Sequence, residues 1–215
     1  MPKKAGIVFV ILGAVLILSA LLLFLFNQQE NQKAGQESEH LAAELQTVIE
    51  QRKQETEPTL PISVEPEETL PETEPVVLDP ELPVVEMEGY EYVGFLAIPS
   101  LALELPVMSD WDYSRLKISP CRQEGSSRTD DLVIAAHNYK THFGGLKDFK
   151  GGEEIHFTDM DGIINFYRVT KIEKLNPQDV MVVLESEHDL VLYTCTYGGS
   201  YRIAVFCDRI IEEKS

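Results

Sequence analysis

The sequence is poor in basic residues: 18 Lys and Arg stand against 36 Asp and Glu among 215 residues, giving a formal net charge of -18. Proteins bind nucleic acid through Lys and Arg side chains that displace counterions from phosphates. The sequence contains no basic patch of that kind, so a nucleic-acid partner is excluded. The acidic excess is concentrated before residue 89, since Asn27 to Glu88 holds sixteen acidic and three basic residues.

Residues spaced as metal ligands are also missing. His137, His142 and His156 are not paired with Cys or carboxylates at a ligand-like spacing. Several acids follow one another closely, but their spacing matches no calcium-binding loop: Asp130, Asp131, Asp159 and Asp161. We therefore expect no metal and no other cofactor.

Cysteine is rare, with 3 residues. An odd number of cysteines outside the cytoplasm is consistent with one catalytic thiol, Cys195, and a disulfide between Cys121 and Cys207. Cys207 directly follows the apolar run Ile203 to Phe206, where a buried free thiol is also natural. The sequence leaves both interpretations open.

One long hydrophobic run is present, the 22-residue segment from Ala5 to Phe26, which is uncharged and apolar apart from Ser19. A helix of this length crosses a hydrocarbon layer of about 30 Å. Lys3 and Lys4 precede it and Lys33 is the next basic residue, so the positive-inside rule predicts a cytoplasmic N-terminus. A cleaved signal peptide is the alternative, although its apolar core is usually shorter. Because no second apolar run follows, we expect a single-pass cell-membrane protein with residues 1–26 as the anchor.

Residues 27–88 read as a juxtamembrane helix and an acidic, proline-rich linker. From Ser38 to Arg52 the residues Leu41, Leu45, Val48 and Ile49 recur at helical spacing. This stripe predicts a short helix, with self-association as an alternative use. The following segment cannot bury enough apolar surface to fold. As a polyproline-like stalk of roughly 27 residues it would hold a domain about 80 Å from the bilayer.

Residues 89–215 suffice for one modest core. Short apolar runs separated by Gly, Asp, Asn or Pro predict about eight strands in an antiparallel barrel or sandwich, with little helix. The runs are Tyr92 to Ile98, Leu101 to Val107, Leu132 to His137, Glu154 to Phe157, Ile163 to Val169 continuing toward Leu175, Val180 to Leu184, Leu190 to Cys195, and Tyr201 to Ile211. Helical turns are expected at Phe143 to Phe149 and at Trp111 to Lys117.

Three of these runs deliver chemically useful side chains to their ends. One run ends at Cys195, another delivers His137, and a turn at Gly198-Gly199 can bring Arg202 back toward the cysteine. Acyl transfer through a thiol needs a sulfur nucleophile, an imidazole to move a proton and a fixed cation for the oxyanion. We predict that these three residues are catalytic. Thr194 and Asn138 adjoin them and are candidates for substrate binding or for a structural turn.

The motifs around these residues resemble those of the sortases, membrane-anchored cysteine transpeptidases of Gram-positive bacteria. The segment Val191-Leu192-Tyr193-Thr194-Cys195 is similar to the TLxTC-like strand end of that family, with Val191 in place of the first Thr. Arg202 matches the family's essential Arg on the next strand. His137, in IAAHNY, matches its His, with Ala136 where many members have Gly. Gly94 to Pro99 and Leu105 to Val107 resemble the first two strands.

The resemblance implies an eight-stranded sortase-type β-barrel that follows a transmembrane helix and a Pro/Glu-rich stalk. It implies cleavage of an LPxTG-like C-terminal sorting signal on a secreted protein through a thioacyl intermediate on Cys195. The acyl group would pass to an amine of a cell-wall precursor or of a pilin lysine. His137 would carry the proton and Arg202 would stabilise the oxyanion.

Two other functions fit the same sequence. One is a different Cys/His acyl-transferase of the cell envelope, such as an L,D-transpeptidase, although the expected Ser-His-Gly-type context does not precede Cys195. The other is a membrane-anchored barrel that binds a partner without turnover. Reactivity of the Cys195 thiol distinguishes this last interpretation from the enzymes.

Overall fold

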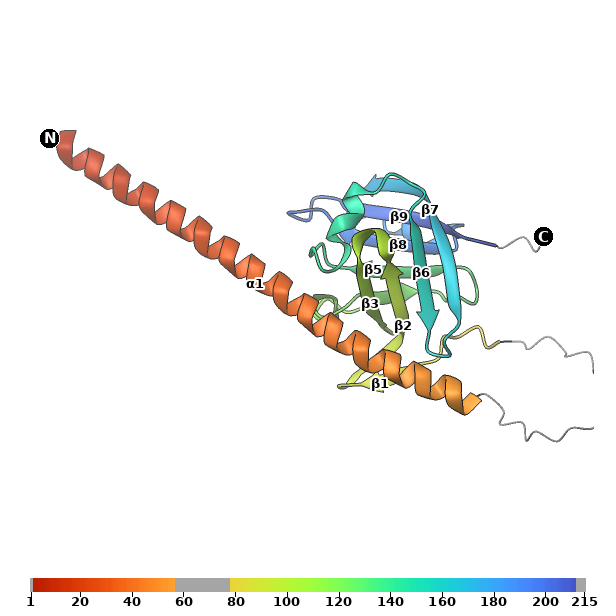
Figure 1. Cartoon of the computed structure of the whole chain (residues 1–215). Coiled ribbons are helices and arrows are strands. Elements are labelled where there is room, and N and C mark those ends of the chain that lie inside the picture. Colours follow the sequence, from red (N-terminus) through yellow and green to blue (C-terminus); the bar gives the residue numbers. More distant parts are fainter. Residues whose placement is uncertain (1, 57–77, 212–215) are drawn as a thin grey trace, which may run out of the picture.

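The computed structural model describes residues 2–56 and 78–211, which form one long helix and a β-barrel (Figure 1). Residues 57–77 of the predicted stalk lie outside the described residues. The elements in chain order are α1 (Pro2–Thr56), β1 (Val85–Met87), β2 (Tyr90–Ile98), η1 (Pro99–Leu101), β3 (Leu103–Met108), η2 (Arg115–Lys117), β4 (Cys121–Glu124), β5 (Leu132–Ala136), η3 (Phe143–Asp148), β6 (Glu154–Asp159), β7 (Ile164–Leu175), α2 (Met181–Leu184), β8 (Leu190–Cys195) and β9 (Arg202–Arg209).

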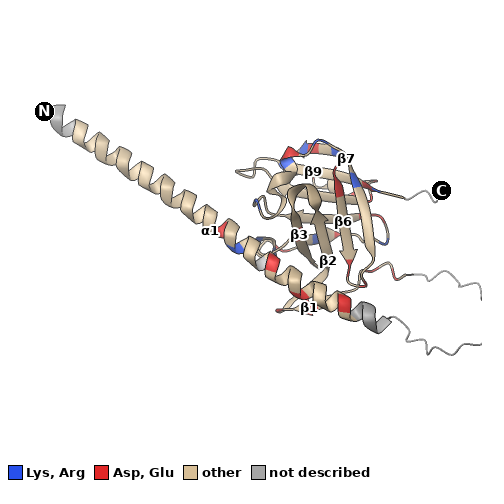
Figure 2. Ribbon diagram, viewed as in Figure 1, with Lys and Arg blue, Asp and Glu red and all other residues tan. Residues whose placement is uncertain are grey.

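Helix α1 contains the predicted membrane-spanning segment. Its large apolar side chains from Ile7 to Phe26 are exposed, and the segment between these two residues carries no charged side chain (Figure 2). By length and composition it is long and apolar enough to cross a membrane. The short helix predicted from Ser38 to Arg52 is the continuation of the same helix, which runs to Thr56.

The barrel is closed by eight strands. The strand order is β1-β2-β3-β4-β5-β8-β9-β7-β6, and β2 also pairs with β6. Strands β2 to β9 thus leave no free edge between them, while β1 extends β2 as a hairpin. The predicted eight-stranded β-barrel is confirmed. Two of its pairings are parallel, β3 with β4 and β5 with β8, so the expectation of a purely antiparallel sheet is corrected.

The helical turn predicted at Phe143 to Phe149 is present as η3, and η2 lies within the second predicted turn. The strand predicted at Val180 to Leu184 is wrong. Met181 to Leu184 form α2, with Val180 as its N-cap. Val183 is buried and Leu184 partly buried, whereas Met181 and Val182 are exposed, a pattern that suits one helical turn rather than a strand. The short strands β1 and β4 were not predicted, because neither is a continuous apolar run.

The barrel interior is filled by alternate residues of the strands. Leu132, Ile134, Leu190, Leu192 and Val205 belong to one buried cluster. From Ile164 to Val169 of β7, exposed and buried side chains alternate. Every second side chain of this segment therefore points into the barrel interior. The intervening residues point outward, where two further clusters form.

One of these outer clusters is covered by the C-terminal half of α1. Leu41, Leu45 and Ile49, three residues of the predicted stripe, are buried with Tyr92 and Met108 of the barrel. The helix therefore uses its stripe to dock on its own barrel (Figure 1). A barrel held about 80 Å from the bilayer does not agree with this packing, because contacts with the barrel begin as early as Asn31 of the helix.

Closure of the barrel depends on a close approach at Gly94, and we predict that Gly94→Ala lowers the free energy of unfolding. A Cβ atom at this position would lie 2.3 Å from the backbone oxygen of Thr158 on β6, so two strands would have to separate. Overpacking of this kind costs about 1–3 kcal/mol. Gly145→Ala is the control, since the atoms nearest to its new methyl are those of the Leu101 side chain rather than backbone atoms. Urea denaturation should show the larger loss for Gly94→Ala, and equal losses would contradict this account.

Candidate active site

Strands β5 and β8 end side by side, and each has a predicted catalytic residue at its end. His137 directly follows β5, and Cys195 is the last residue of β8. The two strands are parallel, and their last pair is Ala136 with Thr194. The next residues along these two segments are His137 and Cys195. Because neighbouring strands lie about 4.8 Å apart, the parallel register sets the imidazole-bearing and thiol-bearing residues next to each other.

Strand β9 brings the third residue to the same place. Cys195 and Arg202 form the terminal pair of the antiparallel β8–β9 ladder. The connection between them is tight: the Thr196 N–H donates to the Tyr201 carbonyl at 2.9 Å. Gly198 and Gly199 have φ of 79° and 72°, in the left-handed region that glycine adopts at low cost. The predicted convergence of His137, Cys195 and Arg202 is therefore a feature of the backbone.

The burial pattern shows on which face of the sheet these side chains lie. Leu192 of β8 belongs to the barrel core, whereas Tyr193 packs against the outer clusters. By the alternation of a strand, Cys195 shares the outer face with Tyr193. Arg202 shares that face with Ala204 of β9, which also lies in an outer cluster. Cys195 and Arg202 are partly exposed, so both are accessible from outside the barrel.

Thr194, a candidate substrate-binding residue, lies on the opposite face. Its side chain is buried and its Oγ1 donates a hydrogen bond to the Ala136 carbonyl at 2.7 Å. This bond links the last residues of β5 and β8 from within the barrel. The structure thus places Thr194 where it fixes the spacing of His137 and Cys195. Asn138, the other candidate, follows His137 directly and is partly exposed.

His137 is enclosed by aromatic rings. Tyr113 meets its ring edge-on with 5.5 Å between centroids, and Tyr139 lies at 5.0 Å with a 35° tilt. Burial lowers the pKa of His137, and the positive charge of Lys117 lowers it further against an opposing effect of Glu30. The imidazole is therefore neutral at pH 7. Its buried Nε2 has no hydrogen-bond partner among the described residues and is free to take up a proton.

These aromatic neighbours were not found from the sequence. Tyr139 stands two residues beyond His137, but Tyr113 comes from the distant β3–β4 connection. A third tyrosine, Tyr193, stands two residues before Cys195, and its hydroxyl donates to Gln123 Oε1 at 2.8 Å. Contacts between segments so far apart in the sequence depend on the barrel closure, which a single sequence does not reveal.

The Arg202 guanidinium is positioned without being neutralised. Its Nη1 donates to the carbonyl oxygens of Gly199 and Tyr201, each at 3.3 Å. Within residues 2–56 and 78–211 no carboxylate forms an ion pair with it. Arg202 also borders a small recess beneath α2, which it shares with Leu175, Asn176, Pro177, Asp179, Val180, Val183 and Tyr193. The arrangement offers a cation for an oxyanion and an apolar surface beside it.

The three cysteines are all free thiols, and only Cys195 is partly exposed. Cys121 lies in the outer cluster under α1, while Cys207 lies in the barrel core. The disulfide considered between them is therefore not formed. Burial raises the pKa of Cys121 to about 12 and raises that of Cys207 as well, which keeps both thiols protonated and unreactive.

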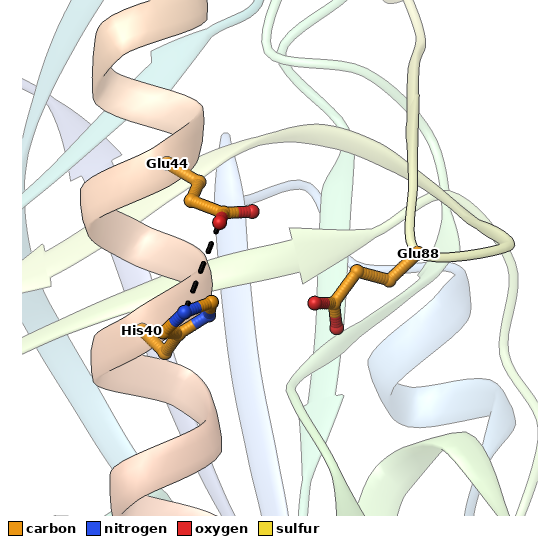
Figure 3. Close-up of side chains that lie close together, drawn as sticks. All are labelled: His40, Glu44 and Glu88. Atoms are coloured by element: carbon orange, nitrogen blue, oxygen red, sulfur yellow. Dashed lines mark ion pairs between the residues drawn. The ribbon is translucent and has the colours of Figure 1, made fainter.

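One group of metal-type ligands occurs away from these strands. His40 and Glu44 lie one turn apart on α1, with 3.7 Å between His40 Nε2 and Glu44 Oε1, and Glu88 of the β1–β2 turn faces them (Figure 3). All three are exposed, so water competes freely for any ion. This grouping alone does not define a metal centre, and it includes none of His137, Cys195 and Arg202.

A large groove also lies away from these strands. It has a volume of about 1060 Å³ and runs between α1 and the β2–η1–β3 region, with Gln36, Ala43, Leu103 and His156 among its lining residues. None of His137, Cys195 and Arg202 lines this groove.

Comparison with known proteins identifies a relationship over the barrel. Residues 96–210 match the family model described as "Sortase domain". A pilus-related sortase C of Group B Streptococcus is 24% identical, over 56% of this chain and 68% of that one, with a TM-score of 0.50. A lid mutant of sortase A from Corynebacterium diphtheriae is 24% identical, over 57% and 72%, with a TM-score of 0.50. Sortase C1 from Streptococcus agalactiae is 22% identical, over 60% and 72%, with a TM-score of 0.51.

The search of curated proteins finds no match. At these identities the solved structures show a shared fold. The assignment of the candidate site therefore depends on the strand register and the burial described above.

Thiol labelling should separate the three cysteines. We predict that a maleimide modifies Cys195 in the folded chain and leaves Cys121 and Cys207 unmodified, because burial protects both and keeps them protonated. Peptide mapping after brief labelling gives the result, and Cys195→Ala should abolish it. Equal labelling of all three in the folded chain would contradict the described burial.

The charge of Lys117 should be visible in the titration of His137. We predict that Lys117→Gln moves the titration midpoint of His137 to higher pH, because removing a nearby positive charge favours the imidazolium. NMR chemical shifts of the imidazole followed against pH measure this. Lys147→Gln is a matched control, since Lys147 is paired with Asp148. A midpoint unchanged or lowered in Lys117→Gln would contradict the assignment.

Proposed function

The chain belongs to the sortase family, and from this premise we propose that it is a transpeptidase whose nucleophile is Cys195. The family implies a sortase-type transpeptidase anchored to a membrane. The observation that supports the assignment of residues is the shared end of β5, β8 and β9, where the pairs Ala136–Thr194 and Cys195–Arg202 bring His137, Cys195 and Arg202 together.

In the first half-reaction the thiol proton of Cys195 passes to His137. The resting imidazole is neutral and its Nε2 is unpartnered among the described residues, so it can accept this proton. The thiolate then attacks the carbonyl carbon of the scissile peptide bond. A C–S bond forms, the C–N bond breaks, and the imidazolium protonates the leaving amine. The product is a thioester on Cys195.

In the second half-reaction an incoming amine attacks the thioester. The amine gives its proton to His137, a new amide bond forms and the thiolate leaves. Arg202 is the strand partner of Cys195, and no described carboxylate forms an ion pair with its guanidinium. It stabilises the oxyanion that develops in both steps. Its planar fork is suited to holding carbonyl oxygens of the substrate in a fixed orientation.

The substrate we propose is an LPxTG-like C-terminal sorting signal of a secreted protein. The surface beside Arg202 supports this choice, because its recess includes Val180, Val183 and Tyr193, and Val180, Met181 and Val182 of the α2 segment are exposed. Apolar side chains of an extended peptide can pack against the exposed Val180, Met181 and Val182 while Arg202 holds the peptide backbone. The acceptor is an amine of a cell-wall precursor or of a pilin lysine. The catalytic domain lies outside the cell and the N-terminus is cytoplasmic, in agreement with Lys3 and Lys4 preceding the apolar segment.

The test is detection of the thioester by intact mass. The full chain in detergent micelles, mixed with a library of LPxTG-like peptides, should gain the mass of an acyl fragment, and an added amine should remove it. Cys195→Ala should gain none. We predict that Arg202→Ala slows adduct formation by about 10²–10³-fold, as loss of an oxyanion donor does.

Arg168→Ala is the matched control for Arg202. Arg168 is an exposed arginine on β7 that is paired with Glu154, so its loss should leave the rate unchanged. A folded chain with a reactive Cys195 that forms no adduct with any peptide would contradict the proposed substrate. An unreactive Cys195 would favour a binding module without turnover. An Arg202→Ala rate equal to that of the unaltered chain would contradict its role.

A further inference from the structure

The apolar segment of α1 and the barrel are separated by very little helix. The last residue of the apolar run is Phe26, and the first described hydrogen bonds to the barrel are made by Asn31. At about 1.5 Å of rise per residue these positions are about 8 Å apart along the helix axis. Because α1 continues unbroken from Pro2 to Thr56, a membrane that contains Phe26 lies close to the part of the barrel that Asn31 touches.

That part of the barrel is the loop after His137. Asn31 Oδ1 accepts the Lys140 N–H at 3.2 Å, and the Asn31 carbonyl accepts the Thr141 hydroxyl at 3.2 Å. Gly35, one turn further, packs so closely on Thr141 that a Cβ atom there would lie 2.6 Å from its methyl carbon. The membrane-proximal end of the docked helix therefore contacts the loop that carries the proposed general acid and base.

The next contacts fix a second loop of the site. The Ser38 hydroxyl donates to the Ile118 carbonyl at 3.1 Å and lies 3.3 Å from Nε2 of the buried His142. Ile118 belongs to the β3–β4 connection, which also supplies Tyr113 to the His137 ring. Further along the helix, Ile49 is buried in the same cluster as Val85 of β1. The barrel is thus docked with its site loops toward the N-terminal, apolar half of α1.

Exposed aromatic side chains gather on these loops. Within residues 2–56 and 78–211, every Trp or Tyr classed as exposed lies either between β3 and η2 or between β8 and β9. They are Trp111 (44% exposed), Tyr113 (63%), Tyr197 (88%) and Tyr201 (40%). Figure 1 shows the β8–β9 loop protruding on the side of the barrel toward the N-terminal half of α1. Trp and Tyr are the residues enriched at membrane–water interfaces, where an apolar ring and a polar group are both accommodated.

We propose that Trp111, Tyr113, Tyr197 and Tyr201 form an aromatic rim that rests in the headgroup layer of the membrane crossed by α1. Cys195 and Arg202 then open onto the bilayer surface, and the enzyme captures acyl donors that are held in the same membrane. The acids that flank Trp111 are already engaged: Asp110 lies 3.6 Å from Arg115, and Asp112 accepts the Ser114 N–H at 2.8 Å. Only the identity of the acyl donor rests on the proposed function, since the orientation itself requires no turnover.

The sequence supplies a probe for this orientation, because Trp111 is the single tryptophan of the chain. The full chain is reconstituted into vesicles of phosphatidylglycerol and phosphatidylcholine, part of the latter brominated near the carbonyl end of its acyl chains. We expect the brominated lipid to quench Trp111 fluorescence by severalfold more than a control tryptophan at the far end of β7. That control combines Trp111→Phe with Ile164→Trp, since Ile164 is 48% exposed. Weak quenching at both positions, or equal quenching at both, would overturn the proposal.

Docking of α1 supplies a second measurement. Gly35→Leu would place a side chain against Thr141 and loosen the contact that orients the barrel. In this variant, shown to be folded by circular dichroism, quenching of Trp111 should fall toward the level of the control tryptophan. Quenching that persists unchanged would contradict an orientation set by the docked helix. These readouts do not depend on activity, so a failure of the proposed reaction would leave them intact.

Discussion

The parallel pairing of β5 with β8 is the constraint on which the proposed chemistry depends. Parallel strands run in the same direction, so both finish at one end of the barrel, and the residues that follow them meet there. The hydrogen bond from Thr194 to the Ala136 carbonyl holds these two ends from the buried side. The relative positions of Cys195 and His137 are thereby set by the backbone of two paired strands and do not depend on a flexible segment. The antiparallel partner β9 then adds Arg202 opposite Cys195.

Burial divides otherwise similar groups into reactive and inert ones. Three thiols are present, yet burial raises the pKa of Cys121 and Cys207 while Cys195 stands at a partly exposed strand end. Among the histidines, His142 is buried against Ser38 of α1, with its pKa lowered to about 4. It therefore stays neutral and serves packing. His137 is also neutral at pH 7, but its Nε2 has no hydrogen-bond partner among the described residues and can accept a proton.

Much of this arrangement could be predicted from the sequence, because strand ends were marked by polar residues after apolar runs. The end of one run at Cys195 and the position of His137 directly after another followed from that pattern. The helix α2 was mistaken for a strand, since Val180 to Leu184 is too short to show its period. The docking of α1 could not be predicted. The stripe of Leu41, Leu45 and Ile49 indicates that one face of the helix is buried, but a single sequence does not identify the surface on which that face packs. The tyrosines around His137 depend equally on long-range closure.

The central claim is that His137 and Cys195 are neighbours on adjacent strands, and a cross-link tests it most directly. In His137→Cys, mild oxidation should join the new thiol to Cys195, because residues on neighbouring strands lie within the Cα separation of about 4.4–6.8 Å that a disulfide requires. Peptide mapping should find the 137–195 linkage, with Cys121 and Cys207 remaining reduced in their buried clusters. Two thiols at 137 and 195 that stay free and are alkylated separately would contradict the account.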